Sequence, residues 1–197
     1  MTTAFLLTKA KHPWTHWGDH GDILVHGMTN HLPRKDGLLQ LERTGPFMPK
    51  LFFPGIADVV LTEQAKIELS SRIPRLTFQP VHKTLLVRLN WHEWPQTNSE
   101  PLAYPESGEP EDYILGQPHD PVLVEDFGPI WELSADIDHE IQGIGGGFRS
   151  RRYRGQHLVR ANITGGYNFV SPELQAALLA VAPGEVELKP VQEDRDA

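Results

Sequence analysis

Two stretches of the chain carry the same order of signals, a strand, then a helix, then a second strand, and they constrain the fold most. The first spans residues 60–81 and the second spans residues 169–191. In the second stretch Ser171 is a favourable helix N-cap, and Pro172 suits the first helical position. Thr62 stands at the equivalent place in the first stretch. The two units are therefore expected to be equivalent in structure, through either duplication or convergence.

Each of the two expected helices has one apolar face, because apolar residues recur at the helical spacing. These residues are Ala65, Leu69 and Ile73 in the first unit and Leu174, Ala177, Leu178 and Val181 in the second. The closing strands alternate apolar and polar residues as far as Pro80 and Pro190, which cannot donate to a β-ladder. The pattern predicts an α+β fold with a mixed or antiparallel sheet and few short helices.

Further strands are expected outside these units, where short apolar runs are bounded by turn residues. They are residues 4–8, 38–43, 84–91 and 157–163, with residues 47–53 as a loop or an edge strand. The length of 197 residues suits one domain. We expect it to comprise a half of about residues 1–94, an acidic, proline-rich connection of about 95–121 and a half of about 122–197.

The charge balance favours a basic partner, because the formal net charge is −8. Nucleic acid and anionic membranes are disfavoured as partners for the same reason. The chain has no cysteine, which excludes disulfides, thiolate metal sites and a thiol nucleophile. No apolar run is long enough to cross a membrane, and the first residues are not expected to form a signal peptide. A cytoplasmic protein is expected.

The acidic connection has two interpretations: a solvated linker, or an arm that contacts a basic partner. It contains no Lys or Arg between residues 95 and 121. The contact residues expected for the arm are Glu106, Glu109, Glu111 and Asp112, with Trp91, Trp94 and Tyr113 as aromatic anchors.

A histidine-rich stretch near the N-terminus could hold a metal. The spacing of His12, His16 and His20 would line one face of a helix, but Pro13 and Gly18 argue against a helix there. The alternative is a loop followed by a short strand over residues 23–26. A metal-dependent enzyme would combine the three histidines with Asp136 or Asp138.

A glycine-rich stretch, residues 143–147, precedes several arginines in residues 149–154. It lacks the Gly-Lys-Ser/Thr of a phosphate-binding P-loop and the third glycine of a dinucleotide fingerprint. It could be a hairpin loop beside a basic strand, or a site for a small phosphate-bearing ligand between Gly143 and Arg154. No nucleophile and base stand at a spacing that predicts catalysis.

Two segments, RTGPFMPKLFFPGIADVVLTEQAKIEL…LTFQPV and GGYNFVSPELQAALL…VELKPV, resemble immunity proteins of bacterial polymorphic toxin systems. The most similar types are the double-CXXCG-motif proteins and related immunity families with a V-S-x-x-L cap, a short helix and a closing x-P-V strand. This chain lacks the cysteine pairs, so a metal site of that kind is absent or replaced by the N-terminal histidines.

The resemblance implies a non-enzymatic protein that binds a cognate toxin and occludes its active site. It implies no catalytic residue and no cofactor, and the expected partner is a basic toxin. The sequence does not indicate an oligomeric state.

Overall fold

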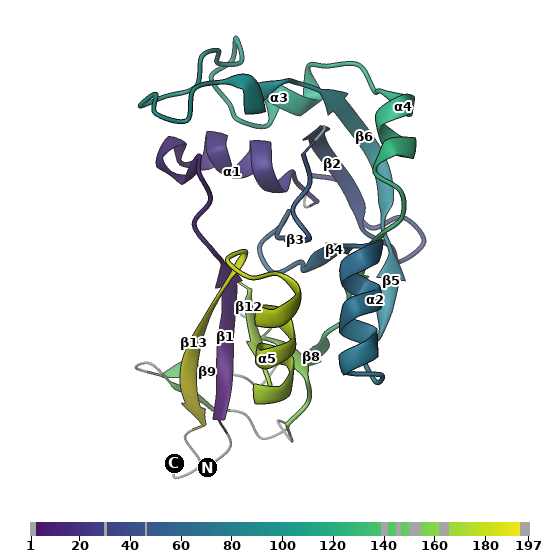
Figure 1. Ribbon diagram of the computed structural model, residues 1–197, viewed down its shortest axis with the longest axis vertical. Helices are drawn as coiled ribbons and strands as arrows, with labels where there is room; N and C mark the ends of the chain where they lie inside the picture. The colour runs from purple at the N-terminus through teal and green to yellow at the C-terminus, as the bar shows by residue number, and fades with distance from the viewer. Residues whose placement is uncertain are drawn as a thin grey trace.

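The computed structural model describes residues 3–29, 31–45, 47–138, 142–144, 147–149, 155–161 and 166–193. Over these residues the protein has an α+β fold, as predicted, with mixed and antiparallel open sheets. The molecule is elongated, with the largest sheet at one end and a helical layer over a two-stranded sheet at the other (Figure 1).

The C-terminal unit is formed by β12 (Tyr167–Val170), α5 (Pro172–Val181) and β13 (Val186–Glu193). Strand β1 (Thr3–Lys9) lies between β12 and β13 and runs antiparallel to both. Phe5, for example, is opposite Val170 on one side and Pro190 on the other. The strand-helix-strand prediction is confirmed here, and the first strand of the chain fills the gap between its two strands.

The earlier unit repeats this arrangement. It consists of β4 (Val60–Thr62), α2 (Glu63–Arg72) and β5 (Phe78–Pro80), and β7 (Ile130–Leu133) lies antiparallel between β4 and β5. The two halves expected from the sequence therefore exchange strands. The sheet of the second half contains β1, and the sheet of the first half contains β7.

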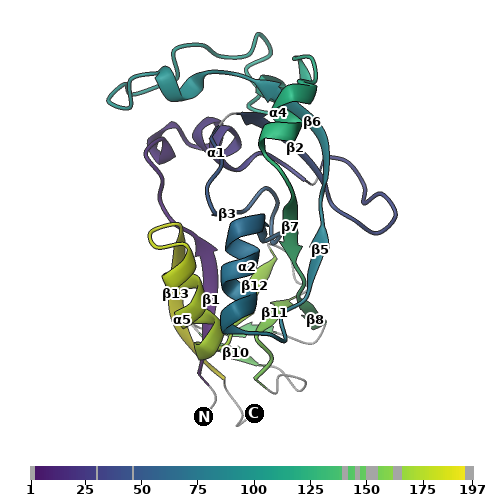
Figure 2. The ribbon, with the colours of Figure 1, turned by 45° about the vertical axis from the view of Figure 1, so that its right-hand side comes forward.

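The two helices begin and pack as their sequences predict. The hydroxyl of Thr62 accepts a hydrogen bond from the Ala65 amide at 3.3 Å, and that of Ser171 accepts one from the Leu174 amide at 3.2 Å. Helices α2 and α5 lie side by side in front of the sheets (Figure 2). Their apolar faces are buried in one core, which includes Leu69 and Leu178.

We expect Thr62→Ala and Ser171→Ala each to lower the free energy of unfolding by about 1 kcal/mol, because each removes an N-cap hydrogen bond. Urea denaturation of the two variants measures this. Ser71→Ala is the control, since Ser71 is an exposed residue near the end of α2 and caps no helix N-terminus. A loss no larger than that of the control would contradict a stabilising N-cap at that position.

Among the described residues the strands form three sheets. The largest has the order β8-β11-β12-β1-β13-β10-β9, and the second has the order β3-β4-β7-β5. The remaining strands of these sheets are β3 (Leu51–Phe52), β8 (Asp136–Asp138), β9 (Gln142–Ile144), β10 (Gly147–Arg149) and β11 (Leu158–Ala161).

The third sheet pairs β2 (Gln40–Gly45) with β6 (His82–Arg88) in parallel. It lies at the end of the molecule where most of the short helices gather (Figure 1). These are the 3-10 helices η1 (Thr15–Trp17) and η2 (Trp91–Glu93) and the α-helices α1 (Asp19–His26), α3 (Asp112–Leu115) and α4 (Pro121–Asp126).

One sequence prediction is wrong in this region: the expected strand over residues 23–26 is the second half of α1. The apolar run Ile23 to Val25 is too short to distinguish a strand from a buried helix by its pattern. The helix is favoured because Asp19 and Asp22 stand in its first turn, at the positive end of the helix dipole. It ends at Gly27, whose φ of 71° suits glycine.

Candidate functional site

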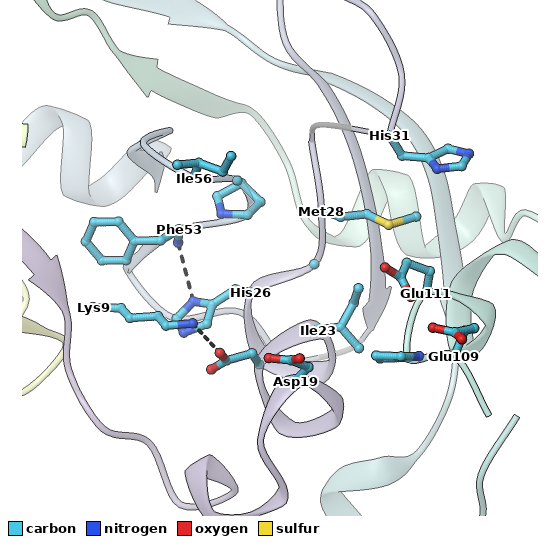
Figure 3. Close-up of a pocket in the computed structure, with 15 residues that line it drawn as sticks. Lys9, Asp19, Ile23, His26, Met28, His31, Phe53, Ile56, Glu109 and Glu111 are labelled. Carbon is cyan, nitrogen blue, oxygen red and sulfur yellow. Dashed lines mark hydrogen bonds and ion pairs between the residues drawn. The ribbon is translucent and has the colours of Figure 1, made fainter. Parts of the chain in front are cut away.

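A pocket of about 560 Å³ opens beside α1. Its walls come from the end of β1, from α1, from residues 53–56 after β3 and from residues 109–111 of the acidic connection. Figure 3 shows Lys9, His26 and Phe53 at one end of the pocket and Glu109 and Glu111 at the other. Segments that are distant in sequence thus line one hollow.

The position of α1 depends on close contact with the preceding loop. A Cβ atom at Gly21 would lie 2.0 Å from the carbonyl oxygen of Trp14, so only glycine fits there. Behind the helix, Trp14 packs edge-on against Trp91 with the ring centroids 4.4 Å apart. Leu24 and Val25 are buried in the same aromatic cluster. This packing fixes the face of α1 that lines the pocket.

The acidic connection is held against α1 and η1. The indole nitrogen of Trp17 donates to the carbonyl oxygen of Asn98 at 3.0 Å. The ring of His20 packs edge-on against Tyr104, with the centroids 4.9 Å apart. The Tyr113 hydroxyl donates to the Ala103 carbonyl at 2.5 Å. The connection is therefore packed on the protein, although most of its residues are exposed.

These contacts give the expected aromatic anchors a different role. Trp91 is fully buried, Tyr113 is 6% exposed and Trp94 is half-buried against the same cluster. Trp91 and Tyr113 therefore cannot present their rings to a partner in this structure. They belong to the core that supports the acidic connection, because a large aromatic ring gains most from burial.

The acidic residues of the connection do reach the surface. Glu106, Glu109 and Glu111 are exposed, and Asp112 is half-buried in the first turn of α3. Glu109 and Glu111 line the pocket together with Asp19 of α1. Within the described part of the chain, Asp19, Glu109 and Glu111 form no ion pair, unlike Asp22, which also lines the pocket.

The other end of the pocket holds a compact polar cluster. Asp22 forms an ion pair with Lys9 through Oδ2, and its Oδ1 lies 3.0 Å from Nε2 of His12. Burial alone would raise the pKa of Asp22, but the hydrogen bonds with His12 and Lys9 outweigh burial and lower it to about 2. Asp22 is thus ionised at neutral pH.

His26 completes this cluster at the last turn of α1. It is 5% exposed, and its Nδ1 accepts a hydrogen bond from the Phe53 amide at 3.3 Å. Burial, followed by the nearby charges of His12 and Lys9, lowers the pKa of His26 to about 3. His26 is therefore a neutral imidazole at physiological pH.

The structure does not bring together the three histidines expected to bind metal. His16 is exposed and lies 2.7 Å from the Asn98 carbonyl through Nε2, while His20 packs against Tyr104. Of the three, only His12 joins the cluster. Pro13 and Gly18 do interrupt the helix, as the sequence indicates, so the i, i+4 spacing of His12 and His16 is not realised. Asp22 and His26 have that spacing on α1 instead.

The sequence also predicted a site at Asp136 or Asp138 and a site in the glycine-rich stretch. Asp136 is exposed and Asp138 is buried on β8, an edge strand of the largest sheet. Strands β9 and β10 form an antiparallel hairpin, as one interpretation of the glycine-rich stretch predicts. Arg151, Arg152 and Arg154 lie outside the described residues, so the small-ligand site expected between Gly143 and Arg154 stays a prediction.

Comparison of the chain with protein-family models, with characterised proteins and with solved structures found no match. The resemblance to immunity proteins therefore rests on the sequence segments alone. In the part of the chain that the structure describes, no helix has the length and apolar character to span a membrane.

Proposed function

We propose that this protein is a non-enzymatic immunity protein that binds a basic toxin and occludes its active site. The observation that carries the proposal is the set of exposed carboxylates around the pocket. Asp19 and the pair Glu109 and Glu111 come from distant segments, line one pocket and have no ion-pair partner among the described residues. That the partner is a toxin follows from the resemblance of the two sequence segments.

The electrostatics support a basic partner. Like charges that gather without counter-charges repel one another, and a cationic side chain from a partner would relieve that repulsion. Complementary charge also speeds diffusional encounter, which is useful for an inhibitor that has to capture its target quickly. The half-buried apolar side chain of Ile23, which lines the same pocket, offers contact to the aliphatic stem of Lys or Arg.

Co-expression tests the proposal directly. The tagged protein is produced together with the products of the neighbouring reading frames of its operon, and bound proteins are identified after a high-salt wash. We expect a stoichiometric complex with a basic protein that stops growth when expressed alone and is harmless in the complex. Rescue of growth without a complex, or a complex with a harmless protein, would contradict the proposal.

The acidic surface makes a second prediction about that complex. Glu109→Lys combined with Glu111→Lys is expected to lower the association rate on the order of tenfold at low salt, with a smaller effect at high salt. Stopped-flow fluorescence measures the rate. Glu125→Lys with Asp126→Lys is the matched control, because it makes the same charge change at exposed positions of α4. Equal rates for the two double variants would exclude the pocket as the contact surface.

A further inference from the structure

The cluster at the base of the pocket has the composition of a metal site. One ring nitrogen each from His12 and His26 and one carboxylate oxygen of Asp22 lie within 4.8 Å of one another. His12 Nε2 and Asp22 Oδ1 are 3.0 Å apart. Two ligands of a tetrahedral zinc ion at 2.0–2.1 Å are separated by about 3.3 Å, so this pair needs little movement.

One buried ring nitrogen of the cluster has no hydrogen-bond partner among the described residues. It is Nε2 of His26, which is not accessible to solvent. Buried polar atoms are nearly always paired, so an unpaired nitrogen on a side chain that is 95% buried calls for an explanation. A metal ion bound to the lone pair of an imidazole nitrogen supplies that missing partner.

We infer that His12, Asp22 and His26 form a binding site for a divalent transition-metal ion, with Zn²⁺ the best match to two imidazoles and one carboxylate. Zn²⁺ prefers this mixture of nitrogen and oxygen ligands, and three protein ligands leave its fourth position to water or another donor. The metal site is inferred without reference to the proposed toxin binding, and it does not include the exposed carboxylates of the pocket.

Two contacts limit the affinity of the site for Zn²⁺, and each predicts a measurable effect. Lys9 places a positive charge on the same carboxylate, which opposes a bound cation. The Phe53 amide donates to Nδ1 of His26, so binding at Nε2 moves the ring proton to Nδ1 and removes that acceptor. We therefore expect micromolar affinity, tighter binding without Lys9, and a Phe53 amide that changes its environment.

The test is calorimetric titration of the full chain, without a histidine tag and after chelator treatment, with ZnCl₂ alone. We expect one ion per chain, binding at least 100-fold weaker in Asp22→Asn and His26→Gln, and unchanged binding in His16→Ala. Lys9→Met, which removes the charge from a half-exposed side chain, is expected to bind about tenfold more tightly. Circular dichroism establishes that each variant is folded.

Two further readouts identify the ligands. Co²⁺ in place of Zn²⁺ should give the visible absorption of a tetrahedral site, and ¹H–¹⁵N spectra should show a shift of the Phe53 amide on addition of Zn²⁺. Binding that is equal in the wild type and His26→Gln would place the metal elsewhere and overturn the inference. Weaker binding in Lys9→Met, or no binding at micromolar Zn²⁺ in either protein, would also overturn it.

Discussion

Replacement of Arg43 by alanine is expected to lower the free energy of unfolding by about 4 kcal/mol. Arg43 is fully buried on β2, and its guanidinium stacks at 5.3 Å from the ring centroids of both Phe52 and Phe127. Its nitrogens donate to the carbonyl oxygens of Thr44, Val25 and Phe47. Alanine would leave a cavity between the rings and three carbonyls without their donor.

Among the described residues Arg43 has no carboxylate partner, so its burial is costly and lowers the pKa of the side chain to about 9. The carbonyl contacts explain why the cost is tolerated. Arg43 joins the last turn of α1, through Val25, to the loop that contains Phe47, and so holds the helix of the pocket against β2. Loss of this side chain should therefore loosen α1 as well as lower stability.

Urea denaturation of Arg43→Ala and Arg43→Met separates the cost of the cavity from the cost of the lost hydrogen bonds. Arg43→Met keeps most of the volume and the contact with the rings, and we expect a loss of about 2 kcal/mol from the unpaired carbonyls alone. Arg88→Ala is the control, because Arg88 forms an exposed ion pair with Asp120 and should cost less than about 1 kcal/mol. A loss at Arg43 no larger than that at Arg88 would contradict this role.

Acid is expected to destabilise the protein through His26. The unfolded chain takes up a proton at the ordinary histidine pKa near 6.5, whereas the folded protein does so only near pH 3. Between these values the unfolded state binds more protons, so stability falls as the pH falls from 6.5 towards 3. From pH 7 to pH 4 this difference amounts to about 3 kcal/mol, at about 1.4 kcal/mol per pKa unit.

Urea denaturation in the presence of EDTA, at pH 7 and pH 4, measures this effect without bound metal. His26→Gln retains a group that can accept from the Phe53 amide but does not titrate, so its stability should fall by about 3 kcal/mol less than that of the wild type. His16→Gln removes an exposed histidine and should follow the wild type. If His26→Gln lost as much stability in acid as the wild type, His26 would not be the cause.

Local signals predicted the frame of the fold well. Thr62 and Ser171 cap their helices because a hydroxyl before a helix satisfies an amide of its first turn, whatever the surroundings. The exchange of β1 and β7 between the halves was not predictable in this way, because strand pairing depends on contacts between distant residues. No residue pattern in β1 or β7 indicates which strands pair with it.

The candidate functional site was predicted less well, because it also depends on contacts between distant residues. The acidity of Glu109 and Glu111 was evident from composition, but their position opposite Asp19 follows from the packing of Tyr113 and Tyr104 on α1. The sequence predicted a histidine cluster at His12, His16 and His20, but a loop breaks the helical spacing there. Recognition of residues 19–26 as a helix would have placed Asp22 and His26 on one face.

The position of β1 has a consequence for the synthesis of the chain. Phe5 is translated long before its partners Val170 and Pro190, which lie opposite it in β12 and β13. Until β12 and β13 have been translated, both edges of β1 lack the strands with which they pair in the folded protein. Closure of the largest sheet therefore waits for β13, and until then the unpaired edges of β1 are open to association with other chains.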